Sequence, residues 1–153
     1  MSRRVYFAFS AGFLLLAAPA LPAAVPTATY EAELDPAPFD ATNRADVINS
    51  IGNVTATLDG SMLTVKGTFS NFSSPATSGS FRIGLAKGVP GDAIGTLSVE
   101  HARQGAFSGS IKLNTAQLAA LKRQALYIRI DSEKSPDGNV WGWLEDSGIG
   151  HVS

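Results

Sequence analysis

Residues 113–144 read LNTAQLAALKRQALYIRIDSEKSPDGNVWGWL, and this segment carries the clearest structural signals in the chain. Near its start, Asn114 can cap a helix, and Gln117 stands three residues later, where a capping box places its second side chain. The leucines that follow have the spacing of a helix that packs one face on a core, and this helix should end near Arg123. The segment therefore predicts one short helix that leads directly into a strand.

Two strands complete the same segment. Residues 126–130 place their apolar side chains on one face, and residues 140–144 do the same with Val140, Gly142 and Leu144. The PDGN sequence between them has the residues that tight turns require. This order predicts an antiparallel hairpin near the end of the domain.

Earlier in the chain, alternation with a period of two recurs in short runs. Residues 54–58 and 63–69 alternate on either side of Asp59-Gly60, which is a strong hairpin signal. Further alternating runs cover residues 30–34, 81–85, 95–100 and 107–113. Residues 35–50 have two prolines and little periodicity, so we expect a long surface loop there. About eight short strands at this spacing predict one all-β domain, a Greek-key-like antiparallel β-sandwich with one short helix.

The beginning of the chain has the layout of a secretory signal peptide. Arg3 and Arg4 provide a positive start, residues 5–18 form an apolar run, and small residues follow. The apolar run is shorter than the roughly 20 residues that a membrane-spanning helix needs, so a removed leader is favoured over a retained anchor. The arginine pair leaves the twin-arginine export route open beside the general one.

We expect cleavage after Ala20 or Ala24. The chain then divides into a signal peptide at residues 1–24 and a domain at residues 25–153. Both export routes end outside the cytoplasm, so we predict a secreted or periplasmic protein with no stable membrane span after leader removal.

The composition excludes several function classes. The chain has 13 acidic and 12 basic residues with no basic face, so nucleic acid is not an expected partner. With no cysteine, disulfides and thiolate zinc sites are excluded. His101 and His151 are too few for an imidazole-rich redox metal site. The sequence also lacks the Gly-x-Ser-x-Gly elbow of many serine hydrolases. We predict no cofactor.

From residue 30 to residue 144, the order of motifs resembles a CHRD (chordin-type) domain. The shared features are an aromatic-x-Ala-x-Leu strand at 30–34, the run GNVTATL at 52–58, and the helix, Tyr-initial strand and apolar-x-Gly-x-Leu strand of residues 113–144. The resemblance implies a family and a fold, and it implies no particular biochemical activity.

The chain departs from the family pattern at polar positions. The middle strand often carries His-x-His in the family, whereas residues 81–84 read FRIG here. A histidine after the Tyr-initial strand is replaced by Asp131, and an arginine of the final strand by Trp141. We therefore interpret the chain as a divergent CHRD member that lacks the usual histidines.

Trp141 and Trp143 are the leading candidates for function. If the residues between and around them face the core, both indoles point outward, about 7 Å apart along one strand. Counting back through the hairpin places Arg129 opposite Trp143 and Asp131 opposite Trp141, so Arg129 can stack on an indole. Tyr127 begins the same strand and completes the predicted binding set. Exposed aromatic pairs suit a sugar ring or a protein partner, unless the chain end or the 35–50 loop covers them.

A second candidate set is acidic. Asp131, Glu133 and Asp137 lie close together in the last hairpin, and such oxygen ligands at this density can bind calcium. A solvated turn explains the same residues, because the spacing departs from that of calcium-binding loops and Lys134 lies among them.

Two function hypotheses follow. The first is a non-enzymatic binding or envelope-associated module with an unknown protein or carbohydrate ligand. The alternative is an enzyme of unknown reaction that uses carboxylates of the acidic loops. Non-adjacent acids that converge in a cleft favour the enzyme, whereas a flat aromatic face favours binding.

Overall fold

The computed structural model describes residues 27–148, where the chain forms nine strands and two helices. The predicted leader lies outside the described residues, so its removal stays a prediction. In chain order the elements are β1 (Thr27–Pro36), α1 (Arg44–Val47), β2 (Ile51–Asp59), β3 (Met62–Ser70), β4 (Ala76–Ile83), β5 (Asp92–Val99), β6 (Gly105–Lys112), α2 (Thr115–Lys122), β7 (Leu126–Ser132), β8 (Val140–Trp143) and β9 (Glu145–Asp146).

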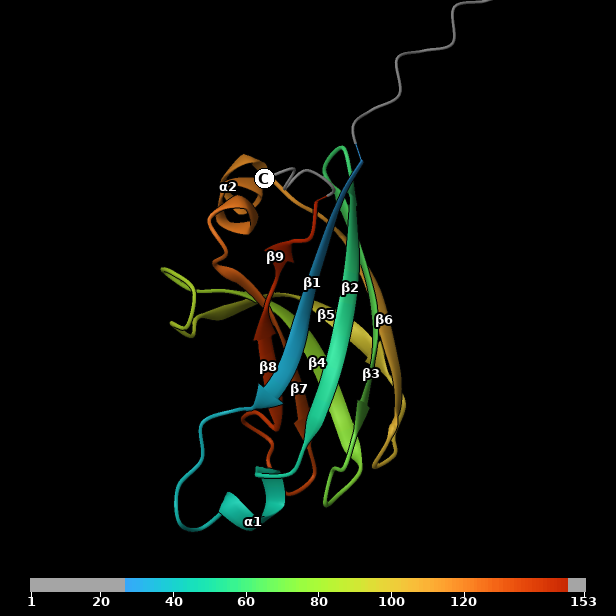
Figure 1. Ribbon diagram of the computed structural model, residues 1–153, viewed down its shortest axis with the longest axis vertical. Coiled ribbons are helices and arrows are strands. Elements are labelled where there is room, and N and C mark those ends of the chain that lie inside the picture. The colour runs from blue at the N-terminus through green and yellow to red at the C-terminus, as the bar shows by residue number, and fades with distance from the viewer. Residues whose placement is uncertain (1–26, 149–153) are drawn as a thin grey trace, which may run out of the picture.

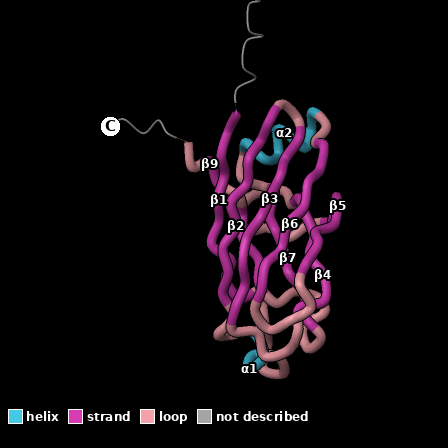
Figure 2. Tube along the Cα trace, turned by 90° about the vertical axis from the view of Figure 1, so that its right-hand side faces the viewer, coloured by secondary structure: helices cyan, strands magenta, loops and turns pink. Residues whose placement is uncertain are grey.

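Eight of these strands close into a barrel (Figure 1). Their hydrogen-bonded order is β1-β2-β3-β6-β5-β4-β7-β8, and β8 pairs again with β1. The short strand β9 adds to β1 outside this circuit. Figure 2 shows the long strands β1, β2, β3 and β6 side by side, with α2 at one end of the barrel and α1 at the other.

The prediction of an antiparallel all-β fold is confirmed, but the prediction of a sandwich is wrong. A sandwich has two separate sheets, whereas here two strands, β1 and β5, each pair with strands of both sheets and so join them. β1 pairs with β2 over residues 27–34 and with β8 through its last two residues. β5 pairs with β4 over residues 92–97 and with β6 through its last two residues. Because both strands change partners along their length, the sheet closes on itself.

The Greek-key element of the prediction has a counterpart in the strand order. β4, β5 and β6 follow one another as neighbours, and the last of them lies beside β3. The chain must therefore cross from β3 past two strands to begin β4, which is the long connection that defines a Greek key.

The barrel interior is apolar because the strands alternate as their sequences predict. In the β2–β3 hairpin the inward side chains are buried while the threonines between them are exposed. The large side chains that are almost completely buried include Phe69, Phe81, Leu126, Ile128, Ile130 and Leu144. Each such side chain contributes roughly 1.5–3 kcal/mol relative to an exposed position, so this interior is the main source of stability.

Two local predictions are confirmed. The Asp59-Gly60 turn joins β2 to β3, and Gly60 takes a positive φ of 64°. At the start of α2, Asn114 Oδ1 accepts a hydrogen bond from the Gln117 backbone N–H at 2.8 Å. Gln117 Oε1 accepts one from the Asn114 backbone N–H at 3.0 Å, which completes the capping box. The helix ends at Lys122, as expected.

Two connections differ from the predictions. The sequence predicts a loop over residues 35–50, but β1 continues to Pro36 and the four-residue helix α1 forms around the buried Val47. The described residues thus hold two helices where the sequence predicts one. The alternation also places Leu85 inward, yet it is 84% exposed. β4 ends two residues before it, and the chain leaves the barrel there as a loop that projects to the left in Figure 1.

Candidate binding groove

β8 presents the two tryptophans on the outer face of the barrel. Val140 and Leu144 are completely buried and Gly142 is buried between them, which agrees with the predicted inward face. Trp141 and Trp143 point to the other side, where both are partly exposed. Their ring centroids are 4.6 Å apart and their planes meet at 70°. The indoles therefore form a corner rather than the flat platform that the sequence suggests.

Tyr127 of β7 supports this corner from beneath. Its ring stacks on Trp143 with centroids 4.6 Å apart, and it meets Trp141 edge-on at 5.8 Å. The Tyr127 hydroxyl accepts a hydrogen bond from the Gly91 backbone N–H at 2.9 Å and donates one to the Gly91 carbonyl at 3.0 Å. Tyr127 is only 1% exposed, so it holds the indoles and the base of the loop at residues 84–91.

The register of the β7–β8 hairpin differs from the prediction by two residues. Tyr127 pairs with Trp143 and Arg129 pairs with Trp141, whereas the sequence predicts Arg129 opposite Trp143 and Asp131 opposite Trp141. The Arg129 guanidinium binds Asp131, with Nε 2.7 Å from Oδ1. Arg129, which the sequence predicts to stack on an indole, therefore forms an ion pair with Asp131 of its own strand.

The turn explains this difference in register. The Asn139 backbone N–H donates to the Ile130 carbonyl at 2.8 Å, which fixes Ile130 opposite Val140. The Asn139 side chain is completely buried and accepts a hydrogen bond from Ser132 Oγ at 2.7 Å. This side-chain bond closes a turn that is wider than a tight turn at Pro136 would be. The sequence has no local signal for such a bond, so it cannot predict the wider turn.

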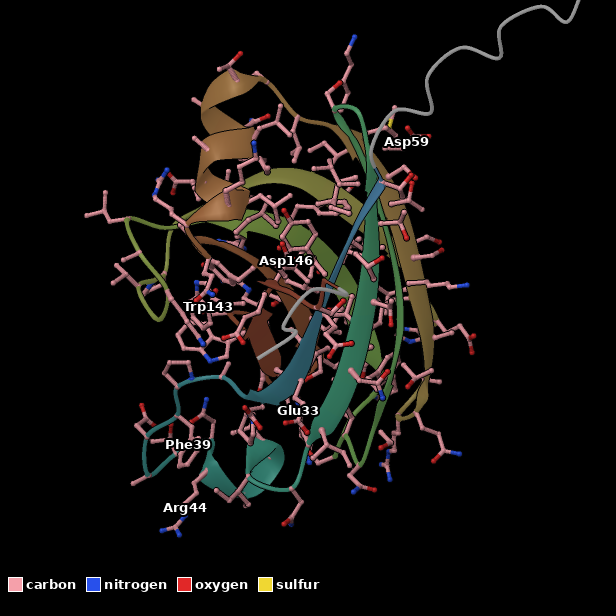
Figure 3. All side chains as sticks on the ribbon, turned by 45° about the horizontal axis from the view of Figure 1, so that its top comes forward. Glu33, Phe39, Arg44, Asp59, Trp143 and Asp146 are labelled. Atoms are coloured by element: carbon pink, nitrogen blue, oxygen red, sulfur yellow. The ribbon has the colours of Figure 1, made fainter. Side chains whose placement is uncertain are left out.

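A groove of about 310 Å³ lies where β8 meets β1, with the indoles as one wall. Asp35 pairs directly with Trp141 across this seam. We call it the aromatic groove, lined by Glu33, Asp35, Lys87, Trp141, Gly142, Trp143 and Glu145. Figure 3 shows Glu33 and Trp143 on this part of the barrel, while Asp59 lies well away from both.

The charges of the aromatic groove are unbalanced. Lys87 Nζ forms an ion pair with Glu145, and the two side chains are 53% and 45% exposed. Glu33 and Asp35 are exposed and form no side-chain hydrogen bond or ion pair with any residue between 27 and 148. Two of its three carboxylates therefore have no counterion within that part of the chain.

An acidic surface continues from the groove along β1 and β9. Glu31 and Asp146 line a neighbouring hollow of about 460 Å³ that shares Glu33 and Glu145 with the groove. Glu31 and Glu145 stand directly opposite each other in the β1–β9 ladder, an arrangement of like charges that destabilises the pair. Burial, and to a lesser extent the charge of Asp146, raises the pKa of the Tyr30 phenol.

One polar group in the groove wall lacks a partner. Trp143 Nε1 is buried and has no hydrogen-bond acceptor among the described residues. Leaving a buried donor unpaired costs about 1–3 kcal/mol of stability. The buried Ser135 Oγ and Asn139 Nδ2 of the β7–β8 turn are unpaired as well, so this feature is not specific to the groove.

The acids proposed for calcium do not converge. Asp131 is bound by Arg129 and also accepts a hydrogen bond from Ser78 Oγ at 3.2 Å. Glu133 lies 3.2 Å from His101 Nε2, and Asp137 stands in the turn. Within residues 27–148 no three histidine, cysteine or carboxylate side chains are placed to hold a metal ion. The calcium interpretation therefore has no geometric support in the described chain.

A larger and shallower groove of about 650 Å³ crosses the outer face of β2, β3, β5 and β6. Its exposed lining consists mainly of short polar side chains, and its one aromatic residue, Phe107, is 2% exposed. Exposed tryptophans contribute more binding energy than serine and threonine hydroxyls. We therefore place the candidate site at the smaller aromatic groove.

Sequence reasoning did not connect four residues of the groove with the tryptophans, namely Glu33, Asp35, Lys87 and Glu145. The alternation of β1 does place the first two on its outer face. Their position beside the tryptophans depends on the pairing of β1 with β8, for which the sequence has no local signal.

Comparison with known proteins identifies the family. The sequence model described as the CHRD domain matches residues 30–144, which is most of the chain. The protein therefore belongs to the CHRD family, as the order of its motifs indicates. No curated protein and no solved structure matches the chain significantly. None of the helices between residues 27 and 148 is long and apolar enough to span a membrane.

Proposed function

We propose that this CHRD protein is an exported, non-enzymatic module that binds a ligand in the aromatic groove. The observation that carries the proposal is the corner formed by the partly exposed indoles of Trp141 and Trp143 beside carboxylates without counterions. Tryptophan is among the residues that contribute most to binding energy. A concave aromatic site with a few polar groups is also the usual form of a ligand site.

The alternative, an enzyme that uses carboxylates, has weaker support. Three carboxylates, those of Glu33, Asp35 and Glu145, do line one groove as that hypothesis requires, but they come from the strands β1 and β9 rather than from loops. A carboxyl group that donates a proton near neutral pH needs a desolvated environment. Glu33 and Asp35 are exposed to solvent, so neither has such an environment.

Intrinsic fluorescence gives a direct test, because the chain has two tryptophans and both line the groove. Peptide and glycan arrays supply candidate ligands, and each binder is then titrated while the indole emission is recorded. Trp141→Ala should weaken binding about 30-fold, which corresponds to a typical hot-spot residue. It should cost less than the roughly 3–5 kcal/mol of folding stability that truncation of a buried aromatic costs.

Phe39→Ala is the matched control, because Phe39 is an aromatic residue that is 39% exposed and lies outside the groove. Its affinity for the same ligand should equal that of the wild type. Equal losses of affinity in both variants, or loss of folding in Trp141→Ala, would contradict the proposal.

Export is tested separately. The positive start and short apolar run support removal of the leader. Mass spectrometry of the exported protein should find a new N-terminus at Leu21 or Val25. An exported form that begins at Met1 would contradict the assignment of residues 1–24 as a signal peptide.

A further inference from the structure

We propose that the aromatic groove receives lysine side chains of a basic polypeptide segment, and that Lys87 occupies the ammonium position when this ligand is absent. The inference rests on the proposed function, since it names the ligand class of the same groove. The argument uses the charges, the resident lysine and the acidic surface beyond the groove.

The charges select a cation. Asp35 stands beside Trp141 across the seam, and Glu33 lines the same groove, both without a counterion in the described chain. A cation that lies over an indole face within about 6 Å of its centre is attracted by the ring quadrupole. Arg129 does not supply this charge, because its guanidinium is neutralised by Asp131. An anionic ligand would be repelled here.

Lys87 lines the groove, so a lysine side chain already reaches this part of the surface. It reaches Glu145 from the loop at residues 84–91, and about half of its side chain remains exposed to solvent. The base of this loop is fixed by the two hydrogen bonds between Tyr127 and Gly91. An incoming ammonium therefore needs to displace only the flexible stem of Lys87, since exposed ion pairs of this kind are weak.

The acidic surface beyond the groove favours a polypeptide over a single cation. Glu31 and Asp146 extend the carboxylates along β1 and β9, and the opposed Glu31 and Glu145 gain from a cation placed between them. A segment with several lysines can satisfy both hollows at once.

The probe is a decapeptide of alternating lysine and glycine with blocked ends, titrated against the full domain by indole fluorescence and calorimetry at fixed ionic strength. The same peptide with every lysine acetylated removes the cations and should not bind. Spermidine is the second arm, which separates a free polyamine from a polypeptide. The lysine peptide should bind more tightly than spermidine.

Three variants test the site. Lys87→Met keeps the length of the stem and removes its charge, and it should tighten peptide binding about two- to fivefold, as expected for loss of a competing exposed ion pair. The double variant Glu33→Gln and Asp35→Asn should weaken binding about tenfold. Asp59→Asn is the matched control, because it removes a carboxylate far from the groove (Figure 3) and should leave the affinity unchanged.

Each contrary result overturns a stated part of the inference. Unchanged or weaker binding by Lys87→Met would show that Lys87 does not occupy the ligand position. Equal weakening by Asp59→Asn would show general charge attraction and remove the site. Spermidine binding as tight as that of the peptide would overturn the polypeptide source. The proposed function fails by a different result, namely a ligand whose affinity does not depend on Trp141.

Discussion

Replacement of Gly142 by alanine should weaken the seam at which the barrel closes. A Cβ atom at this position would lie 2.4 Å from the Glu33 carbonyl oxygen and 2.8 Å from Leu34 Cδ2. Ordinary contact begins at 3.4 Å, so the methyl group would stand about 1 Å too close to a backbone atom that cannot rotate away. Overpacking a core costs about 1–3 kcal/mol, and we expect the upper part of that range, about 2–3 kcal/mol, because β1 itself must move.

Urea denaturation followed by far-ultraviolet circular dichroism measures this cost. With a slope of about 1.5 kcal/mol per molar urea, the midpoint should fall by about 1.3–2 M, and Gly142→Val should lower it further. Gly148→Ala is the matched control, because the three atoms nearest to its new Cβ would be carboxyl atoms of the exposed Asp146 side chain, which can rotate aside. That variant should stay within about 0.5 kcal/mol of the wild type. Equal midpoints for the two variants would refute the close approach of β8 to β1.

Three further predictions concern other parts of the fold. Asn114→Ala should lower the free energy of unfolding by about 1 kcal/mol through loss of the capping box, and an unchanged thermal midpoint would contradict this. Tyr127→Phe removes both bonds to Gly91 and should cost about 1–2 kcal/mol, with faster amide exchange at Gly91 than in the wild type. The pKa of Tyr30 is raised above 10.0, so the neutral phenol contributes fully to folding stability below pH 10, and this contribution is lost as the pH rises further. Tyr30→Phe should flatten this alkaline loss of stability. An identical dependence of stability on pH in the variant and the wild type would argue against burial of the phenol.

Local chemistry explains which parts of the fold were predictable. Asp59-Gly60 forms its turn and Asn114 forms its cap because the signal and the bonded atoms lie within a few residues. The inward faces of β2, β3 and β8 follow for the same reason, since a strand with one buried face must alternate. The family resemblance rests on the order of these local motifs.

The remaining features depend on contacts between distant residues. Closure of the barrel requires Asp35 and Pro36 to pair with β8, more than a hundred residues later. The hairpin register depends on the buried bond between Ser132 and Asn139. α1 is only four residues long, too short for any helical period to appear, and Val47 holds it against the core.

The candidate site likewise has residues that local sequence predicts and residues that only distant contacts bring together. The alternation of β8 identified Trp141 and Trp143 as outward residues, and that local inference agrees with the structure. Lys87 and Glu145 come from a loop and an edge strand that only the folded chain brings to the indoles. The sequence predicts Arg129 opposite Trp143, whereas it pairs with Trp141. An error of two residues in the hairpin register changes the partner of a side chain but leaves the side chain on the same face of the sheet.

Nuclear magnetic resonance mapping of the labelled domain during titration with the lysine peptide tests the central claim most directly, because it locates the ligand without any substitution. The two indole N–H signals should both shift, together with backbone amides at Glu33, Asp35, Lys87 and Glu145, which line the aromatic groove. Shifts confined to the outer face of β2, β3 and β6, with the indole signals unmoved, would contradict the account.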